Sequence, residues 1–216
     1  MGRSLFAGSN CGYADATTPA KALFSTLGGL AFDGAGNLFV ADSGNQRVRE
    51  VAADGTVSTV AGNGRPATSS PIYTPSDVAV DAAGNLYIAD RYNYCIRKVT
   101  PDGIIATVAG TPQVFGNMGD GGPATLARLG TPLAVKVDAD GSLWVADSNH
   151  VVRRVAPDGI ISTVAGTGSP GFASEGPAWA SALFTPSGLA VTPNGVYVAD
   201  SGSGRVRLLT RPVSSQ

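Results

Sequence analysis

The stretch DGAGNLFVADSGNQRVREVAADGTVSTVAG, residues 33–62, decides the fold because the chain repeats it with small changes. The copies align on an Ala-Asp pair that recurs four times, at Ala41-Asp42, Ala89-Asp90, Ala146-Asp147 and Ala199-Asp200. Subtracting the aspartate numbers gives spacings of 48, 57 and 53 residues. A period in this range, repeated at least three times, indicates a solenoid or a propeller.

Each copy reads as four short strands separated by turns. In the first copy, branched or aromatic residues alternate with small ones over 29–33 and 38–41, with a glycine-containing turn between the two segments. A third strand carries Arg47-Val48-Arg49, and an Ala-Asp-Gly turn leads to a fourth strand at 58–62. Four short antiparallel strands per repeat are typical of a propeller blade.

The two ends of the chain complement each other. The fourth copy stops after its third strand, near Leu208-Leu209-Thr210, whereas Ser4-Leu5-Phe6-Ala7-Gly8 reads like the fourth strand Ser162-Thr163-Val164-Ala165-Gly166. We therefore predict an all-β fold, a β-propeller of four four-stranded antiparallel blades whose last blade is closed by the N-terminal strand. A fragment cut from a larger propeller at a repeat boundary would show the same ends, so an open fragment of a larger, six-bladed type is the alternative.

The predicted boundaries follow from the repeats. One domain covers residues 1–212, and a disordered tail follows at 213–216. The blades are expected at 22–62, 71–110, 126–166 and 183–210, the last with 3–8.

The composition argues against several classes of partner and location. Hydrophobic residues make up 43% of the 216, and 15 basic residues stand against 16 acidic ones, which argues against nucleic acid as a partner. No apolar run approaches the roughly 18 residues of a membrane span, and no signal-type apolar core follows residues 1–4. Cys11 and Cys95 are expected to be free thiols, with a bridge between them as the alternative.

A charged pair recurs in every copy. An aspartate opens the loop after the second strand, and an arginine follows on the third strand, where it can reach the same carboxylate. Recurrence in all four copies favours a shared structural role over four active sites. The predicted structural residues are Asp42, Asp90, Asp147 and Asp200 with Arg47, Arg97, Arg153 and Arg205.

Residues 75–103 resemble the NHL repeat, whose unit reads roughly P-x-G-[VL]-A-V-D-x-x-G-N-L-Y-[VI]-A-D-x-x-N-x-R-[IV]-R-K-V-x-P-D-G. The linker at 119–125, with Val164-Ala165-Gly166, resembles the long-linker variety common in exported bacterial proteins. The resemblance implies a propeller, commonly six-bladed, and an exported or extracellular location. It leaves function open, since such propellers include protein and RNA binders, sensors, structural modules and a few lyases and hydrolases. Lys136 departs from the pattern, because the other copies have a small residue there.

Propellers usually bind ligands at the mouth of the central channel, where the blade-joining loops and the loops between second and third strands meet. These loops vary between copies and hold a polar and aromatic mixture favoured in recognition patches. The predicted binding residues are Tyr92, Tyr94, Asp120, His150, Glu175 and Trp179.

The sequence favours a non-catalytic scaffold that binds a protein, peptide or glycan through these loops. The alternative is a small hydrolase or lyase with its active site in the channel and His150 as the catalytic candidate. A single histidine cannot supply the several metal-binding histidines of the amidating lyases that share this sort of propeller. No cofactor is expected, with a structural calcium ion as the possibility. Oligomers are expected if the ring is not closed.

Overall fold

A computed structural model describes residues 7–8, 11–62, 72–172 and 176–210, and it is an all-β, four-bladed β-propeller without an α-helix in this part of the chain. Blades 1 to 3 have four strands each and blade 4 has three described strands, all paired antiparallel. Blade 1 contains β1 (Leu27–Phe32), β2 (Leu38–Asp42), β3 (Arg47–Val51) and β4 (Val57–Ala61). Blade 2 contains β5 (Pro75–Val80), β6 (Leu86–Asp90), β7 (Cys95–Val99) and β8 (Ile105–Ala109).

The second half of the chain repeats this plan. Blade 3 contains β9 (Pro132–Val137), β10 (Leu143–Asp147), β11 (Val151–Val155) and β12 (Ile161–Ala165), and blade 4 contains β13 (Pro186–Thr192), β14 (Gly195–Asp200) and β15 (Arg205–Thr210). Short 3-10 turns lie in the loops, at η1 (Pro19–Lys21), η2 (Ser43–Asn45), η3 (Arg91–Asn93), η4 (Ala124–Leu126), η5 (Ala178–Ala180) and η6 (Ser201–Ser203).

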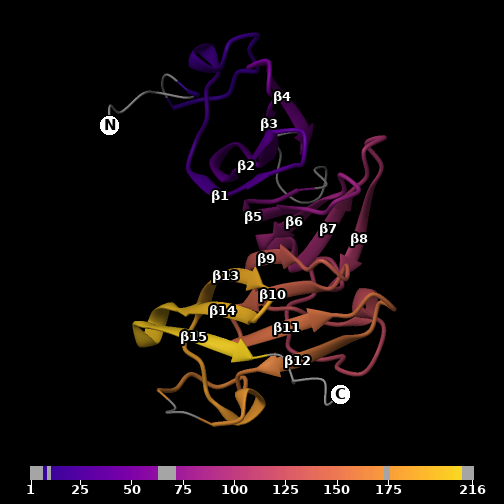
Figure 1. The fold of residues 1–216 in the computed structure, drawn as a ribbon, viewed down its shortest axis with the longest axis vertical. Coiled ribbons are helices and arrows are strands. Elements are labelled where there is room, and N and C mark those ends of the chain that lie inside the picture. The colour runs from indigo at the N-terminus through magenta and orange to yellow at the C-terminus, as the bar shows by residue number, and fades with distance from the viewer. Residues whose placement is uncertain (1–6, 9–10, 63–71, 173–175, 211–216) are drawn as a thin grey trace.

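The first strand of every blade lies nearest a common axis, and the later strands lie progressively outward (Figure 1). The inner strands pack in chain order, β1 against β5, β5 against β9 and β9 against β13. Within the described residues, no comparable contact joins β13 to β1. Most of the predicted closing strand, residues 3–6, and the predicted tail at 213–216 lie outside the described residues, so closure and tail stay predictions.

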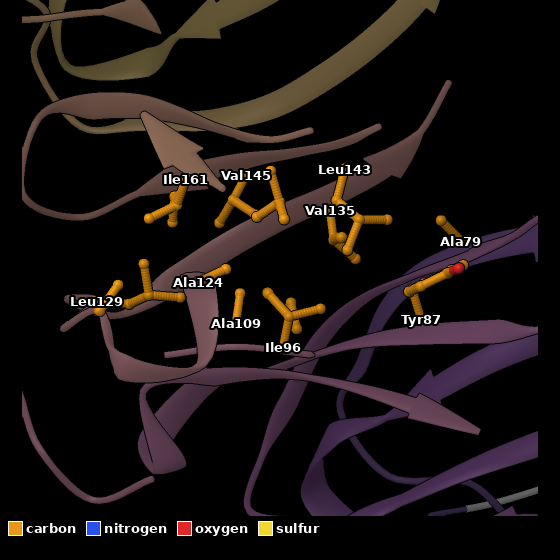
Figure 2. Packing of buried hydrophobic residues seen from close by; sticks show 13 residues of the cluster. Ala79, Tyr87, Ile96, Ala109, Ala124, Leu129, Val135, Leu143, Val145 and Ile161 are labelled. Atoms are coloured by element: carbon orange, nitrogen blue, oxygen red, sulfur yellow. The ribbon is translucent and has the colours of Figure 1, made fainter. Parts of the chain in front are cut away.

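The core lies between the blades. Figure 2 shows the cluster between blades 2 and 3, where Ala79 and Tyr87 approach Val135 and Leu143 of the next sheet. Because Ala79 is small, the inner strands can approach closely, while the larger Tyr87 ring fills the space farther from the axis. Burial of this apolar area, at about 25 cal/mol per Å², is the main stabilising contribution.

Glycine at the end of each fourth strand is required by the backbone. Gly62, Gly110 and Gly166 all have a φ between 82° and 88°, and each lies directly over a carbonyl of the loop between second and third strands. A Cβ atom at any of them would collide with that carbonyl, so no other residue fits without moving the loop.

Replacement of Ile96 by alanine tests the contribution of the cluster between blades 2 and 3. Ile96 is fully buried in it, and a cavity at such a site costs about 2–5 kcal/mol. Urea unfolding should show a loss of this size for Ile96→Ala. The matched variant Ile104→Ala, at a 62% exposed position, should stay within about 0.5 kcal/mol of the wild type. Equal effects of both substitutions would contradict this packing.

Candidate functional site

The recurring aspartate ties each blade's loop to the segment that enters the same blade. In every copy the carboxylate accepts a hydrogen bond from the backbone N–H of a residue 16 or 17 positions earlier in the chain. The four aspartates are Asp42, Asp90, Asp147 and Asp200. These bonds measure 2.8, 2.7, 2.8 and 2.6 Å. All four aspartates are fully buried, so their role is to fix the loops of the propeller mouth.

The arginine partners differ from the prediction in copies 1, 3 and 4. In copy 3, Arg153 pairs with Asp120 and acts on Asp147 only through its charge. Asp42 pairs with Arg49 at 3.2 Å, Asp90 with Arg97 at 3.3 Å and Asp200 with Arg207 at 2.9 Å. The sequence pattern predicted Arg47 and Arg205, which stand two residues before the arginines that form the pairs. Arg47 lies directly opposite Asp42 and Arg205 directly opposite Asp200, but each carboxylate pairs with the arginine two residues farther along the strand, which lies on the same face.

Counting a fixed number of residues from each aspartate would have found its partners Arg49, Arg97 and Arg207. The arginine stands seven residues after the aspartate in copies 1, 2 and 4, and six residues after it in copy 3, where the loop is one residue shorter. Arg47 instead donates to the Asn45 carbonyl at 3.0 Å and lies 3.7 Å from the centre of the Tyr13 ring. Arg205 donates to the Phe172 carbonyl at 3.4 Å.

Asp120 belongs to this structural network. Its carboxylate accepts from Arg153 Nη2 at 2.6 Å, and Asp15 accepts from Arg49 Nη2 at 2.5 Å in the same way. Both acids stand in the segment that precedes a blade and hold it against a buried arginine of that blade. Charge-assisted bonds of this kind are about twice as strong as neutral ones.

The other predicted binding residues lie at separate blade boundaries. Tyr92 stacks with Tyr73 at 5.4 Å, and Tyr94 meets Phe115 edge-on at the same centroid distance. Trp179 stands on η5 with 70% of its surface exposed. Glu175 lies outside the described residues. The structure therefore distributes the predicted set over several loops and does not gather it into one cluster.

His150 has a structural role in the fold. It occupies a left-handed conformation, φ 63°, at the loop position that holds Gln46, Tyr94 and Gly204 in the other copies. Its Nδ1 accepts the backbone N–H of Thr185 at 3.0 Å, and its ring packs edge-on against Phe184. These contacts link blade 3 to the segment that enters blade 4.

An ion pair stands at the axis, where the repeats lead one to expect small residues. Lys136 Nζ on β9 lies 2.6 Å from Asp77 Oδ2 on β5, and the backbone N–H of Val135 donates to the same oxygen at 3.0 Å. Gly29 of β1 lies against this carboxylate, where a Cβ atom would collide with it. Three innermost strands thus converge on Asp77.

Two serine hydroxyls lie at the start of the inner strands, and Arg91 and Tyr92 stand on η3, which contacts β5. Ser43 donates to the Pro75 carbonyl, and Ser76 donates to the Pro132 carbonyl at 2.7 Å. Arg91 lies 5.2 Å from the centre of the Tyr92 ring, and its buried Nε has no hydrogen-bond partner among the described residues. The axial mouth is defined here by Ser43, Ser76, Asp77, Arg91, Tyr92 and Lys136.

Sequence reasoning noted Lys136 only as a departure and missed Asp77. The equivalents of Asp77 in the other copies are Gly29, Ala134 and Gly188, and those of Lys136 are Ala31, Ala79 and Ala190. The pair could have been found in the sequence, because Asp77 and Lys136 carry opposite charges and each replaces a small residue on one of two neighbouring inner strands.

The described residues contain no group of three His, Cys, Asp or Glu side chains arranged to hold a metal ion. Cys11 is exposed, Cys95 is buried, and both thiols are free. Burial and the neighbouring Asp90 raise the pKa of Cys95 to about 12.

No helix in the described part of the chain has the length and apolar character of a membrane span.

Four antiparallel sheets around an axis define a β-propeller. The model of the NHL repeat matches residues 73–99, and the model of the teneurin NHL domain matches residues 110–184. The matched parts of the chain therefore carry NHL-repeat sequence, as the sequence predicted.

Known proteins resemble parts of this chain. The chloroplastic protein SUPPRESSOR OF QUENCHING 1 of Arabidopsis thaliana is 37% identical over 81 residues, which are 36% of this chain and 8% of that protein. A gluconolactonase from Xanthomonas campestris superposes with a TM-score of 0.65 at 21% identity, over 88% of this chain and 59% of that one. An auxiliary nutrient binding protein from Bacteroides ovatus superposes with a TM-score of 0.66 at 18% identity. The match covers 86% of this chain and 48% of that one.

This chain spans less than two thirds of each of these three proteins. At these identities the two solved structures establish the fold alone.

Replacement of Arg49 by methionine tests the buried network. Arg49 and Asp42 are both fully buried, and removal of one partner leaves an uncompensated charge, which costs about 3–5 kcal/mol. Chemical denaturation of Arg49→Met should show this loss. Arg154→Met, which removes the half-exposed pair with Asp140, should cost at most about 1 kcal/mol. Equal losses in the two variants would argue against a special role for the buried pair.

Acid titration tests the buried aspartates. Burial raises the pKa of Asp90 to about 6, against the lowering effect of Asn93 and Arg97. In the unfolded chain the pKa is about 3.9. Between pH 4 and 6 the folded state therefore binds more protons at this carboxyl than the unfolded chain does. The stability that the carboxyl contributes at low pH is lost as the pH rises through 6.

The variant Asp90→Asn stays neutral and should lack this loss. Between pH 4 and 7, the wild type should lose about 2 kcal/mol of unfolding free energy relative to the variant. Asp102→Asn, at an exposed turn, serves as the control. Parallel pH profiles of wild type and Asp90→Asn would show that this pKa is not raised.

Proposed function

We propose that this NHL-repeat propeller is a non-catalytic binding module and that its axial mouth binds a hydroxyl-rich ligand, a glycan in preference to a peptide or protein. The observation that carries the proposal is the Asp77 and Lys136 pair at 2.6 Å on the inner strands. Burying charge costs free energy unless it is paired, and an apolar or small residue at either position would build the same blade. Two charges retained at the axis therefore favour a role in recognition.

The neighbouring groups suit a sugar. The hydroxyls of Ser43 and Ser76 donate to backbone carbonyls and can still accept hydrogen bonds, and the Arg91 guanidinium adds N–H donors. The Tyr92 ring is 42% exposed and offers a flat face to the apolar side of a sugar ring. The resemblance in fold to auxiliary nutrient binding proteins of Bacteroides supports ligand binding as a role of such propellers.

The rival proposal is a hydrolase or lyase in the channel, and structural neighbours that are named gluconolactonases keep it open. The candidate His150 is engaged through Nδ1 with the Thr185 backbone and occupies a loop position that every copy uses. These contacts favour a structural role for this residue. An exported or extracellular location stays a prediction.

A glycan array followed by calorimetry tests the proposal. Loss of a charged hydrogen-bond partner costs about 1.5–3 kcal/mol, so Lys136→Met should weaken binding of the identified glycan by about tenfold or more. Tyr92→Ala should also weaken it, because it removes the stacking face. Lys98→Met, on β7 away from the axial mouth, should bind like the wild type.

The melting temperature of each variant separates lost binding from lost folding. Unchanged affinity in Lys136→Met and Tyr92→Ala would overturn the axial site. A peptide or protein ligand with the same dependence would keep the site but change the ligand class. Lactone hydrolysis that disappears in Lys136→Met would favour the enzyme.

A further inference from the structure

Arg91, on the loop that borders the axial mouth, is a further departure from the repeat. It follows the recurring Asp90, and the residue after the aspartate is a serine in the other three copies, at Ser43, Ser148 and Ser201. The backbone of the loop is nearly unchanged, because the aspartate has φ −84° and ψ 82° in blade 2 and φ −87° and ψ 70° in blade 1. Serine builds the same loop, so the loop itself does not require an arginine.

The repeat places Arg91 at the boundary of blades 2 and 3, where the axial ion pair lies. Ser43, its counterpart in blade 1, donates a hydrogen bond to the carbonyl of Pro75 at the start of the next inner strand. The counterpart of Pro75 in blade 3 is Pro132 at the start of β9, since each lies opposite the recurring aspartate of its blade. Arg91 therefore stands on the loop that faces the start of β9, the strand that carries Lys136.

The Arg91 guanidinium has no acidic partner among the described residues. The ion pairs of this part of the chain do not include it, and every acidic residue except Glu175 lies in this part. The carboxylate of Asp77 is already paired with Lys136 at 2.6 Å. The axial mouth thus contains two cations and a single carboxylate, and the charge of Arg91 is left without compensation.

Aromatic side chains hold this guanidinium in position. Its central carbon lies 5.2 Å from the centre of the Tyr92 ring, which in turn stacks with Tyr73 at 5.4 Å. The backbone N–H of Tyr92 donates to the Tyr73 carbonyl at 3.2 Å, so the loop is fixed to the segment that enters the blade. Contact with an aromatic ring uses none of the N–H groups of Arg91, which therefore stay able to donate to a ligand.

A structural role alone does not account for Arg91. The residue is half-buried, and its Nε is buried without a hydrogen-bond partner in the described structure. Partial burial of a charge without an acid costs free energy, and a buried donor without an acceptor adds to this cost. The serine found in the other copies would avoid both costs. An arginine retained at this position therefore favours a negatively charged ligand.

We propose that the axial mouth binds an acidic glycan and that Arg91 binds the carboxylate of a uronate unit. The inference rests on the proposed glycan site and specifies the class of sugar. A planar carboxylate accepts two parallel N–H bonds from an arginine, and such charge-assisted bonds are stronger than those to a neutral hydroxyl. The carboxylate compensates the charge of Arg91, and the hydroxyl groups of the sugar are left to bind Ser76 and Lys136.

Matched pairs of ligands test the inference. Oligosaccharides of glucuronate, galacturonate, mannuronate and guluronate are compared with their methyl esters, which keep the sugar and remove its charge. In calorimetry with the full chain, at least one of these acids should bind about tenfold more tightly than its own ester. The difference should shrink when NaCl is raised from about 50 to about 500 mM, because salt screens an ion pair that is accessible to solvent.

Arg91→Ser, which introduces the residue of the other copies, gives the sharpest readout. It should bind the acid and the ester equally, and its affinity for the ester should match that of the wild type. Arg91→Lys should keep only part of the preference, because an ammonium group cannot form the two parallel bonds. Lys98→Met removes a positive charge on β7, away from the axial mouth, and should keep the full preference. Melting temperatures confirm that each variant folds, and the comparison of acid with ester in the wild type needs no variant.

The outcomes separate this inference from the proposed function. A wild type that binds every ester as tightly as its acid would overturn the inference, and the glycan site would stand if Lys136→Met and Tyr92→Ala still weaken binding. A preference for the acid that survives in Arg91→Ser would also overturn it, because another group would then bind the carboxylate. Tighter binding of sulfated oligosaccharides than of uronates would exclude the carboxylate as the recognised group. Failure to bind any glycan would overturn the proposed function, and the inference with it.

Discussion

The packing of one sheet's face on the inner strands of the next is the interaction on which this structure depends. A single blade buries too little apolar area to be stable, and each contact such as that of Tyr87 with blade 3 supplies what the isolated sheet lacks. The same contact, repeated, orients every blade around the axis. Phe32 of blade 1 and Tyr197 of blade 4 lack such a contact within the described residues and are exposed.

The polar network maintains the mouth that this packing creates. Loop aspartates such as Asp90 satisfy backbone N–H groups of the entering segment, and buried arginines such as Arg49 connect the loop to the preceding linker. Because these groups are shielded from water, loss of one member leaves the others unsatisfied. The loops can therefore vary in sequence while their ends remain fixed.

Function in such a repeat protein is expected where one copy differs from the others. His150 and Asp120 attracted attention as polar loop residues, yet their contacts belong to the architecture. Asp77 and Lys136 break the pattern on the inner strands and meet at the axis. The departures from the repeat were visible in the sequence, but their proximity was not, because it depends on which strands face each other.

The sequence by itself determined the number of blades, their strands, the glycine turns and the NHL family, because the repeats carry their own hydrophobic alternation and turn chemistry. It also identified the aspartates, since each stands directly after a buried strand. Only the tertiary structure decided that Arg49 and Arg207 pair with these carboxylates, because Arg47 and Arg205 lie on the same strand faces and sequence alternation cannot separate residues two apart. The axial pair of Asp77 and Lys136 depends on a contact between separate sheets, which no pattern within one repeat contains.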